Sequence, residues 1–137
     1  MDQASLDHVA IAVLNLDLAQ KVYEDLGLVF DATREVVAKE QVTTAFAKIG
    51  EHCHLELLQP LDGQGPIQKF LDQKGPGIHH LCYRVKNIEA TCRDLKAKGY
   101  RLIYDAPSTG AGGAKVNFIH PKSTGGVLIE LSEKGSA

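Results

Sequence analysis

The sequence has little of what would place it in several large classes of protein. Its 137 residues carry 15 Lys and Arg against 17 Asp and Glu, a formal net charge of −2, so no basic field is available to bind nucleic acid. The longest uninterrupted apolar run is residues 9–14, far shorter than a membrane span. The first residues, Met-Asp-Gln-Ala-Ser, lack the basic and apolar regions of a signal peptide. We therefore expect a cytoplasmic protein whose partners include neither nucleic acid nor a membrane.

Cysteine is also scarce. The three cysteines, at positions 53, 82 and 92, are odd in number and form no Cys-x-x-Cys pair, which argues against a disulfide framework and against a cysteine zinc site. We interpret them as reduced thiols that pack as small apolar side chains. Because 44% of the residues are apolar and 23% are charged, the composition is that of a globular domain, and the histidines become the more informative residues.

What the sequence does contain is an internal repeat. Residues 8–15 (HVAIAVLN) align with residues 80–87 (HLCYRVKN) at an offset of 72. The same offset relates Phe46 to Phe118, whereas the next carboxylates, in strands 53–59 and 126–132, are 74 residues apart, as a two-residue hairpin insertion would give. The repeat predicts a single domain of two modules, residues 1–64 and 77–137, joined by a connector at residues 65–76.

Each module has the pattern of a βαβββ unit. We expect a strand, then a helix capped by Asn15 or Asn87, then three further strands. In the first helix, Leu18, Val22 and Leu26 repeat at helical spacing, with Ala19 and Tyr23 beside them, as in an amphipathic helix. The connector is expected to contain a short helix over residues 66–74. The expected strands are residues 6–13, 28–36, 41–49 and 53–59 in the first module, and residues 79–85, 100–105, 114–120 and 126–132 in the second.

Strand alternation places one His and one Glu of each module on the face opposite the apolar side chains. These residues are His8 and Glu56 in the first module, and His80 and Glu130 in the second. Modules related by a pseudo-two-fold axis would bring the four together, and two imidazoles with two carboxylates suit a borderline-to-hard divalent cation. His79 has the opposite parity, so the repeat selects its neighbour, although a β-bulge would reverse that choice.

The other histidines carry simpler interpretations. A single strand histidine is more often a hydrogen-bonded core or edge residue than a metal ligand, and recurrence in both modules is what favours ligation. His52 and His54 have no counterparts in the second module. We therefore interpret them as exposed residues of a hairpin.

The two modules and their His and Glu residues resemble the vicinal oxygen chelate superfamily of glyoxalases, bleomycin resistance proteins and dioxygenases, over nearly the whole chain. Several blocks resemble the methylmalonyl-CoA epimerase family within it. The blocks are residues 6–10 (LDHVA), 55–61 (LELLQPL), 77–81 (GIHHL), 112–122 (GGAKVNFIHPK) and 126–131 (GVLIEL), of which the last two are long and specific. The resemblance implies an α+β fold in which two tandem βαβββ modules form a cupped mixed β-sheet around a metal site.

The activity implied by the resemblance is that of a metal-dependent epimerase. It would interconvert (2R)- and (2S)-methylmalonyl-CoA by proton transfer through a metal-stabilised enolate. Carried over by position, the ligands of one divalent ion (Co, Mn, Zn, Mg or Ni) fall on His8, Glu56, His80 and Glu130. We expect Glu130 to be one proton-transfer base, with Glu56 as the weaker candidate for the other. Some relatives have a glutamate base where this chain has Thr44, which cannot act as that base at neutral pH. A homodimer is also implied.

A further set of residues is expected to contact the acyl-CoA substrate. The set is Thr44, Arg84, Lys115, Asn117, His120 and Lys122. Lys115 and Asn117 share one strand face and are candidates to meet the malonyl carboxylate or the CoA phosphates, with a solvated or turn residue as the alternative. Arg84 shares the parity of His80, with a structural ion pair as the alternative. The glycine-rich residues 108–114 form either a flexible hairpin loop or a loop that approaches the substrate through backbone N–H groups.

Three other functions remain open. A glyoxalase I-type lactoylglutathione lyase uses a similar ligand set, and only residues 112–122 argue against it. An iron dioxygenase uses two His and one carboxylate with open positions, so a fourth protein ligand counts against that chemistry. A non-catalytic binding protein of the bleomycin-resistance type generally lacks the ligand set, and the absence of any metal uptake would favour it.

Overall fold

A computed structural model describes residues 3–110 and 113–135. By their internal contacts the residues form two compact units. The first unit is residues 8–79, and the second unit is residues 80–137 together with residues 1–7. No helix in the described part of the chain has the length and apolar character needed to cross a bilayer. The division between the units falls inside the strands β1 (Ser5–Ala12) and β5 (Gly77–Arg84) rather than in the connector.

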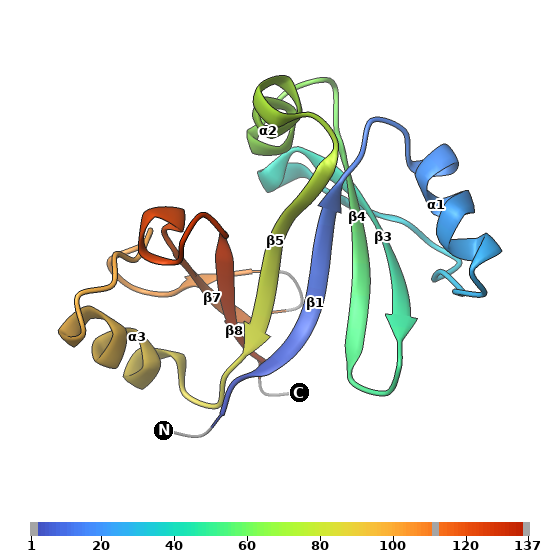
Figure 1. Ribbon diagram of the computed structural model, residues 1–137. Helices are drawn as coiled ribbons and strands as arrows, with labels where there is room; N and C mark the ends of the chain where they lie inside the picture. The colour runs from blue at the N-terminus through green and yellow to red at the C-terminus, as the bar shows by residue number, and fades with distance from the viewer. Residues whose placement is uncertain (1–2, 111–112, 136–137) are drawn as a thin grey trace. The chain divides into compact units, whose positions relative to one another are not determined.

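The first unit contains most of β1, two helices and three further strands. Its other elements are α1 (Leu16–Asp25), β2 (Glu35–Val37), a 3-10 turn (Ala38–Glu40), β3 (Val42–Ile49), β4 (Cys53–Pro60) and α2 (Pro66–Lys74). The strands are hydrogen-bonded in the order β2-β3-β4-β1. The pair β1 and β4 is parallel, and the other neighbours are antiparallel. Figure 1 shows α1 beside β3 and β4.

Alternation along β4 sorts the core of the first unit into two clusters. Leu57 packs with Leu16 of α1 on one face of the sheet, whereas Leu58 packs with Ile67 of α2 on the other. Because side chains alternate along a strand, Glu56 points to the face of Leu58 and α2. The helices therefore cover opposite faces of this sheet, and the carboxylate lies on the α2 side.

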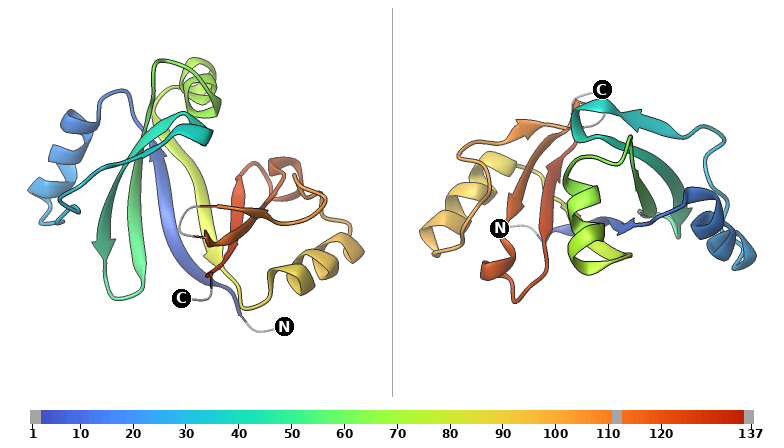
Figure 2. Two further views of the ribbon diagram at one scale, coloured as in Figure 1. Left: turned by 180° about the vertical axis from the view of Figure 1, so that it is seen from behind. Right: turned by 90° about the horizontal axis from the view of Figure 1, so that it is seen from above.

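The second unit repeats the arrangement, and its described residues include no helix equivalent to α2. Its elements besides β5 are α3 (Ile88–Ala97), β6 (Ser108–Thr109), β7 (Lys115–Ile119), a 3-10 turn (Pro121–Ser123) and β8 (Ile129–Glu133). The strand order is β5-β8-β7-β6, with β5 and β8 parallel and the other neighbours antiparallel. Ile88 and Cys92 of α3 pack against Ile119 and Leu131, so α3 covers one face of β7 and β8 (Figure 2).

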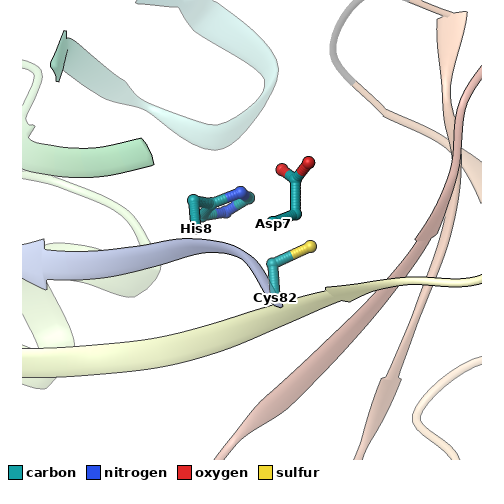
Figure 3. A group of neighbouring side chains, drawn as sticks. All are labelled: Asp7, His8 and Cys82. Atoms are coloured by element: carbon teal, nitrogen blue, oxygen red, sulfur yellow. The ribbon is translucent and has the colours of Figure 1, made fainter. Parts of the chain in front are cut away.

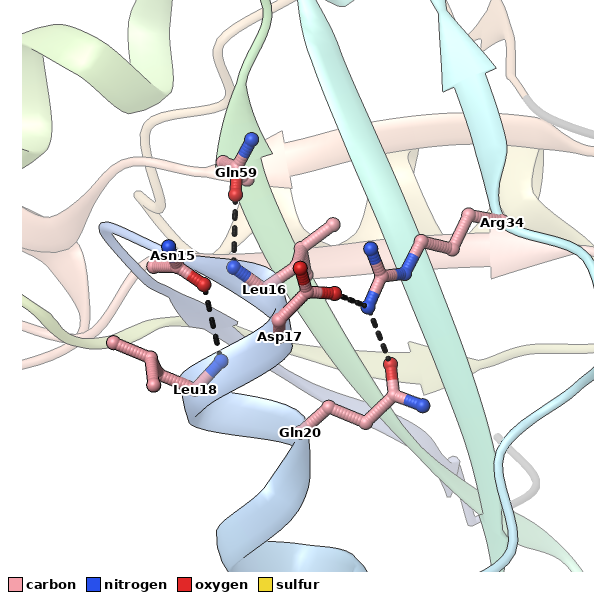
Figure 4. A network of polar contacts seen from close by, with 7 residues as sticks. All are labelled: Asn15, Leu16, Asp17, Leu18, Gln20, Arg34 and Gln59. Carbon is pink, nitrogen blue, oxygen red and sulfur yellow. Dashed lines mark hydrogen bonds and ion pairs between the residues drawn. The ribbon is translucent and has the colours of Figure 1, made fainter.

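The two long helices begin in the same way. The Asn15 side chain accepts a hydrogen bond from the Leu18 N–H at 3.0 Å, and the Asn87 side chain accepts one from the Ala90 N–H at 3.0 Å. Each asparagine thereby satisfies an N–H group that has no partner inside the helix. The N-caps expected from the sequence are confirmed. Figure 4 shows the cap of α1 and, beside it, an ion pair between Asp17 and Arg34.

A second anchor ties the start of each helix to the last strand of its unit. The Leu16 N–H donates to Oε1 of Gln59 at 2.8 Å (Figure 4), and the Ile88 N–H donates to Oε1 of Glu133 at 2.9 Å. The helix positions differ by 88 − 16 = 72, and the strand positions by 133 − 59 = 74. These are the offsets that the sequence gives for the paired histidines and for the paired glutamates. The two-residue shift between the modules is therefore a feature of the structure.

One helix packs on a different face from the one expected. Leu18, Val22 and Leu26 are exposed, and α1 packs instead through Leu16 and Ala19. The helix carries apolar residues over more than one face. The expected row Leu18, Val22 and Leu26 is exposed, whereas Ala19 and Tyr23 beside it pack against the core.

Two expected strands are much shorter than predicted. Residues 28–36 contribute an isolated bridge from Phe30 to Ala47 and part of β2. Residues 100–105 contribute only an isolated bridge from Leu102 to Ile119. The remaining strands and the connector helix over residues 66–74 lie close to the expected ranges.

Candidate functional site

The second unit brings His80 and Glu130 together. His80 lies on β5 and Glu130 on β8, and Nε2 of His80 is 3.1 Å from Oε1 of Glu130. The side chains are 9% and 15% exposed, so both are mostly withdrawn from water. Strand pairing explains the contact, because β8 runs parallel to β5 with Glu130 opposite Cys82, two residues beyond His80.

The first unit places His8 and Glu56 in an equivalent register. The strands β1 and β4 are also parallel, and Glu56 lies opposite Ala10, two residues beyond His8. Since side chains two residues apart point to the same face of a strand, His8 and Glu56 share a face of the first unit. In both units, the residue paired with the glutamate therefore lies two positions after the histidine: Ala10 after His8, and Cys82 after His80.

A phenylalanine accompanies each of these carboxylates. Phe46 lies opposite Glu56 on β3, and Phe118 lies opposite Glu130 on β7. The Phe118 ring also meets the His80 ring edge to face, with the centroids 6.2 Å apart. The sequence contained the signal for this pair, since the two phenylalanines are 72 residues apart, but their place beside the carboxylates comes from strand pairing.

The donor atoms of each unit fit a divalent cation. Imidazole nitrogen and carboxylate oxygen are ligands for borderline and hard divalent ions, and each unit offers one of each on adjacent parallel strands. A carboxylate in a mostly buried strand also needs a charged or hydrogen-bonding partner. Within the second unit the imidazole of His80 is such a partner for Glu130.

The histidines next to these residues lie in different surroundings. His79 stacks edge to face on Phe70 of α2, with the ring centroids 5.0 Å apart, while its neighbour His80 contacts Glu130. His52 is exposed, as expected. His54 is not an exposed hairpin residue, because it is half-buried in β4 and lies opposite His8 in the strand pairing. His54 and Glu56 are two residues apart in one strand, so the sequence already indicated that their side chains share a face.

Arg84 forms an ion pair inside the second unit. Its guanidinium donates to Oδ1 of Asp7 through Nε, at 3.2 Å, and also through a terminal nitrogen. Asp7 and Cys82 point to the same side of their strands (Figure 3). The sequence had offered a structural ion pair as the alternative role of Arg84, and Asp7 is a partner that it did not identify.

Lys115 and Asn117 share one strand face, but it is the face covered by α3. Lys115 Nζ lies 2.9 Å from Oε1 of Glu89 on α3. The Asn117 side chain is fully buried; its amide donates to the Tyr104 carbonyl at 3.1 Å and to Sγ of Cys92 at 3.5 Å. Alternation along β7 puts Phe118 and Glu130 on the opposite face. Lys115 and Asn117 therefore make their contacts on the α3 side of the second unit.

The pKa values on this face follow from those contacts. The hydrogen bond from Lys115 lowers the pKa of Glu89 below its ordinary value of 4.5, and the same bond raises the pKa of Lys115 above 10.5. Burial raises the pKa of the Cys92 thiol, with a smaller opposing effect from the Asn117 hydrogen bond. A protonated Cys92 thiol is consistent with a packing role.

The remaining expected contacts lie at turns or within the sheet. Nδ1 of His120 accepts the Lys122 N–H at 3.1 Å, which shapes the turn after β7. Thr44 is buried on the same face as Glu56, and its hydroxyl donates to the Glu35 carbonyl at 3.3 Å.

Part of the glycine-rich segment is a strand rather than a loop. Residues 108–109 form β6, which pairs with β7. A Cβ at Gly110 would lie 2.9 Å from Cγ1 of Val116, so glycine is needed there for close packing. Residues 111–112 of the segment lie outside the described residues.

Comparisons with known proteins fit this geometry. A model of the Glyoxalase/Bleomycin resistance protein/Dioxygenase superfamily matches residues 7–118. An ethylmalonyl-CoA/methylmalonyl-CoA epimerase from Cereibacter sphaeroides is 40% identical over 132 residues, which cover 93% of this chain and 96% of the relative.

Two solved structures are similar as well. The crystal structure of a methylmalonyl-CoA epimerase from Mycobacterium tuberculosis is 41% identical, has a TM-score of 0.87, and is matched over 99% of this chain and 94% of its own. A variant of the Streptomyces coelicolor methylmalonyl-CoA epimerase in complex with 2-nitronate-propionyl-CoA is 31% identical, has a TM-score of 0.88, and is matched over 98% of this chain and 100% of its own. The fold class expected from the sequence is thereby confirmed.

Proposed function

Because the chain belongs to the glyoxalase, bleomycin resistance protein and dioxygenase superfamily, we propose that it is an epimerase that interconverts (2R)- and (2S)-methylmalonyl-CoA. The observation that carries the proposal is the duplicated His–Glu arrangement, on parallel strands of the same register, in a chain 41% identical to a methylmalonyl-CoA epimerase. The relatives named as epimerases match over almost the whole chain, so the proposal concerns the complete fold and not one motif.

The proposed metal ligands are His8 and Glu56 of the first unit with His80 and Glu130 of the second. The two pairs together offer two imidazole nitrogens and two carboxylate oxygens to one divalent ion. When bound, such an ion supplies Lewis-acid stabilisation of negative charge that develops on the substrate oxygens. The identity of the ion among Co, Mn, Zn, Mg and Ni does not follow from these donor types.

The reaction needs a proton to leave one face of a carbon and return to the other. The α-carbon of methylmalonyl-CoA lies between a thioester and a carboxylate. The thioester delocalises the negative charge as an enolate, and further stabilisation of that charge is needed for a carboxylate base to remove the proton. We assign Glu130 as one base and Glu56 as the second, weaker candidate. Thr44 lies on the face of Glu56, and its hydroxyl is bound to the Glu35 carbonyl, so it is a candidate for substrate contact and not for proton transfer.

The substrate class of the proposal is acyl-CoA. The support is the solved Streptomyces coelicolor relative, which is named as a complex with 2-nitronate-propionyl-CoA. The mild net charge of −2 means that CoA phosphates would be met by individual cations. Lys122 and His120 at the turn after β7 remain candidates for that contact. A cytoplasmic location and a homodimer complete the proposal.

Solvent exchange at the α-carbon tests the proposed function directly. The purified protein is incubated with methylmalonyl-CoA in D2O, with added Mn²⁺ or Co²⁺ and in parallel with excess EDTA, and loss of the α-proton signal is followed by proton NMR. We expect exchange with the metal and at least a 100-fold slower rate after chelation. Absence of exchange with either metal contradicts the epimerase proposal.

The same preparation separates the alternative activities. Formation of S-lactoylglutathione from methylglyoxal and glutathione would identify a glyoxalase I-type lyase instead. A protein that takes up no divalent ion in equilibrium dialysis and supports neither reaction would be a binding protein of the same fold. The matched variants are His80→Ala, which should abolish exchange, and His52→Ala, which removes an exposed histidine and should leave exchange unchanged.

A further inference from the structure

The edge strand β2 presents one carboxylate on the face of the first unit that carries Glu56. Glu35 of β2 lies directly opposite Thr44 of β3. Residues directly opposite each other in an antiparallel pair have their side chains on the same face of the sheet. Since Thr44 shares the face of Glu56, Glu35 lies on that face as well.

Packing of the neighbouring residues shows which face this is. Val37 lies opposite Val42 in the same strand pair, and Val42 is buried in the core cluster that contains Ile67 of α2. Because side chains two residues apart share a face of a strand, Val37 and Glu35 both lie on the α2 side. Val36, between them, lies on the opposite side and is 58% exposed.

Two residues of β3 form the floor between the two carboxylates. Thr44 lies opposite Glu35, and Phe46 lies opposite Glu56. With strands about 4.8 Å apart and a rise of about 3.3 Å per residue, the Cα atoms of Glu35 and Glu56 are two strands across and two residues along, about 12 Å apart. A small acyl group fits between side chains that rise from the same face at this separation.

The backbone of Glu35 is held in place, and the cation next to it in sequence is engaged elsewhere. The Thr44 hydroxyl donates to the Glu35 carbonyl at 3.3 Å. Nη2 of Arg34 donates to Oδ1 of Asp17 at 2.7 Å and to Oε1 of Gln20 at 3.1 Å (Figure 4). The guanidinium is thus bound to α1, which covers the opposite face of the sheet.

We propose that Glu35 is an acid–base residue of this chain and transfers the α-proton on one face of the bound acyl group. The inference rests on the proposed function, in which two groups must act on opposite faces of one carbon. In that proposal Glu56 gives a carboxylate oxygen to the metal, which makes it a poor base. Glu35 lies outside the ligand set, so its carboxylate is available for proton transfer.

The proton and the electron pair balance in this step. The Glu35 carboxylate takes the α-proton, and the electron pair of the broken C–H bond delocalises into the thioester carbonyl as an enolate. Protonated Glu130, the proposed base of the second unit, then delivers a proton to the other face of the carbon, where the enolate electron pair forms the new C–H bond. Proton exchange of the two carboxyl groups with water restores their starting states.

Epimer-resolved exchange distinguishes a proton-transfer residue from one that only supports binding. Each epimer of methylmalonyl-CoA is incubated separately in D2O with Mn²⁺ and the wild-type chain or Glu35→Gln. Proton NMR follows loss of the α-proton, and circular dichroism of the thioester follows inversion. Glu35→Gln should exchange one epimer at close to the wild-type rate, because the remaining base reaches one face of the carbon. Exchange of the other epimer, and inversion, should fall about 100-fold or more.

Two variants serve as matched controls. Glu35→Val combined with Val36→Glu keeps the composition and charge of β2 but moves the carboxylate to the opposite face, so it should lose inversion as Glu35→Gln does. Glu24→Gln removes an exposed carboxylate of α1, on the other side of the sheet, and should behave as the wild-type chain does. Isothermal titration with Mn²⁺ should give Glu35→Gln the wild-type Kd, since Glu35 is not a proposed ligand.

Three outcomes overturn the inference. Wild-type inversion by Glu35→Gln would leave Glu35 as a charge that protects an edge strand from pairing. Equal loss of exchange from both epimers would assign it to binding instead. Wild-type inversion by the variant with the moved carboxylate would reject the face assignment. Far-ultraviolet circular dichroism checks that the variants are folded, which is expected because Glu35 and Val36 are exposed.

Failure of the proposed function gives a different result. A wild-type chain that exchanges neither epimer contradicts the epimerase activity itself, and this inference falls with it. A wild-type chain that inverts both epimers, with an equally active Glu35→Gln variant, contradicts only the role of Glu35.

Discussion

Nε2 of His80 lies 3.1 Å from Oε1 of Glu130, and the parallel pairing of β5 with β8 fixes this relationship. The pairing of β1 with β4 sets His8 and Glu56 in the same register. Each unit therefore carries one imidazole and one carboxylate whose positions are determined by backbone hydrogen bonds and not by flexible loops.

Replacing Glu130 with Gln tests the proposed site without removing a side chain of similar shape from the second unit. The amide keeps the shape of the side chain but is neither a strong ligand nor a base, so we expect exchange at the α-carbon to fall by about 100-fold or more. Isothermal titration with Mn²⁺ should show weaker binding. The matched control is Glu133→Gln on the same strand, whose amide oxygen can still accept the Ile88 N–H. Full exchange and undiminished metal binding in Glu130→Gln would remove Glu130 from the proposed site.

Phe118 is expected to position His80. Its ring meets the imidazole edge to face and lies opposite Glu130 in the strand pairing, so Phe118→Leu leaves the imidazole freer to turn away from the carboxylate. Loss of a side chain that supports a ligand weakens metal affinity by about 10- to 100-fold. We expect a loss of that size in Mn²⁺ titration while the thermal midpoint changes little.

Tyr104 provides the control for that variant. Its ring packs edge to face on Phe118, at 5.9 Å between centroids. Tyr104→Phe keeps the ring and should keep the metal affinity. If Phe118→Leu binds Mn²⁺ as tightly as the wild-type chain does, the ring has a packing role only.

Much of this arrangement could be predicted from the sequence because the same pattern of residues occurs in both modules. The repeat placed the two Asn N-caps, and strand alternation put Glu130 on the face opposite Leu131. Both are local properties that depend on neighbouring residues and on the period of the strand.

Non-local properties could not be predicted in the same way. Periodicity could not decide which apolar face of α1 meets the sheet, since Leu16 and Leu18 are equally apolar and tertiary packing makes the choice. Strand alternation showed that Lys115 and Asn117 share a face, but which face α3 covers depends on tertiary packing. Asp7 as the partner of Arg84 depends on contact between residues 77 positions apart.

Asn117 should matter for stability and not for metal binding. Its amide oxygen accepts the N–H groups of Tyr104 at 3.1 Å and Phe118 at 2.8 Å, and its nitrogen donates to the Tyr104 carbonyl. Asn117→Leu leaves these partly buried groups without their partner, which should lower the free energy of unfolding by about 1–3 kcal/mol. Urea denaturation measures the loss. An unchanged midpoint would mean that water or backbone rearrangement replaces the amide.

The Glu89–Lys115 pair should give the second unit a measurable pH dependence. The pKa of Glu89 is lowered below 4.5, chiefly by the hydrogen bond from Lys115. A carboxylate with a lowered folded-state pKa contributes stability that is present above the unfolded value, and loses it as the pH falls through the folded value. The pKa of Lys115 is raised, so its contribution is present below 10.5 and is lost as the pH rises through the folded value.

Lys115→Met tests this assignment. The substitution should raise the pKa of Glu89 toward 4.5 in a carbon-detected NMR titration, and should flatten the acid limb of the thermal midpoint against pH. Since both side chains are exposed, the effect is small and should diminish further in salt. A Glu89 pKa that stays low in Lys115→Met would assign the shift to the helix backbone instead.

The two N-caps offer the same interaction in two units of one chain. Asn15 and Asn87 each accept an N–H three residues ahead at 3.0 Å, so Asn15→Ala and Asn87→Ala should each lower the free energy of unfolding by about 1 kcal/mol. The Asn→Asp variants retain the acceptor and add a charge that favours the helix N-terminus, so they should match or exceed the wild-type stability. Equal losses would show that the repeat has conserved the energetics of the cap as well as its geometry. A much larger loss at one site would mean that the start of that helix depends more strongly on its cap. The second anchor of each helix would then be tested by substituting Gln59, which accepts the Leu16 N–H, or Glu133, which accepts the Ile88 N–H.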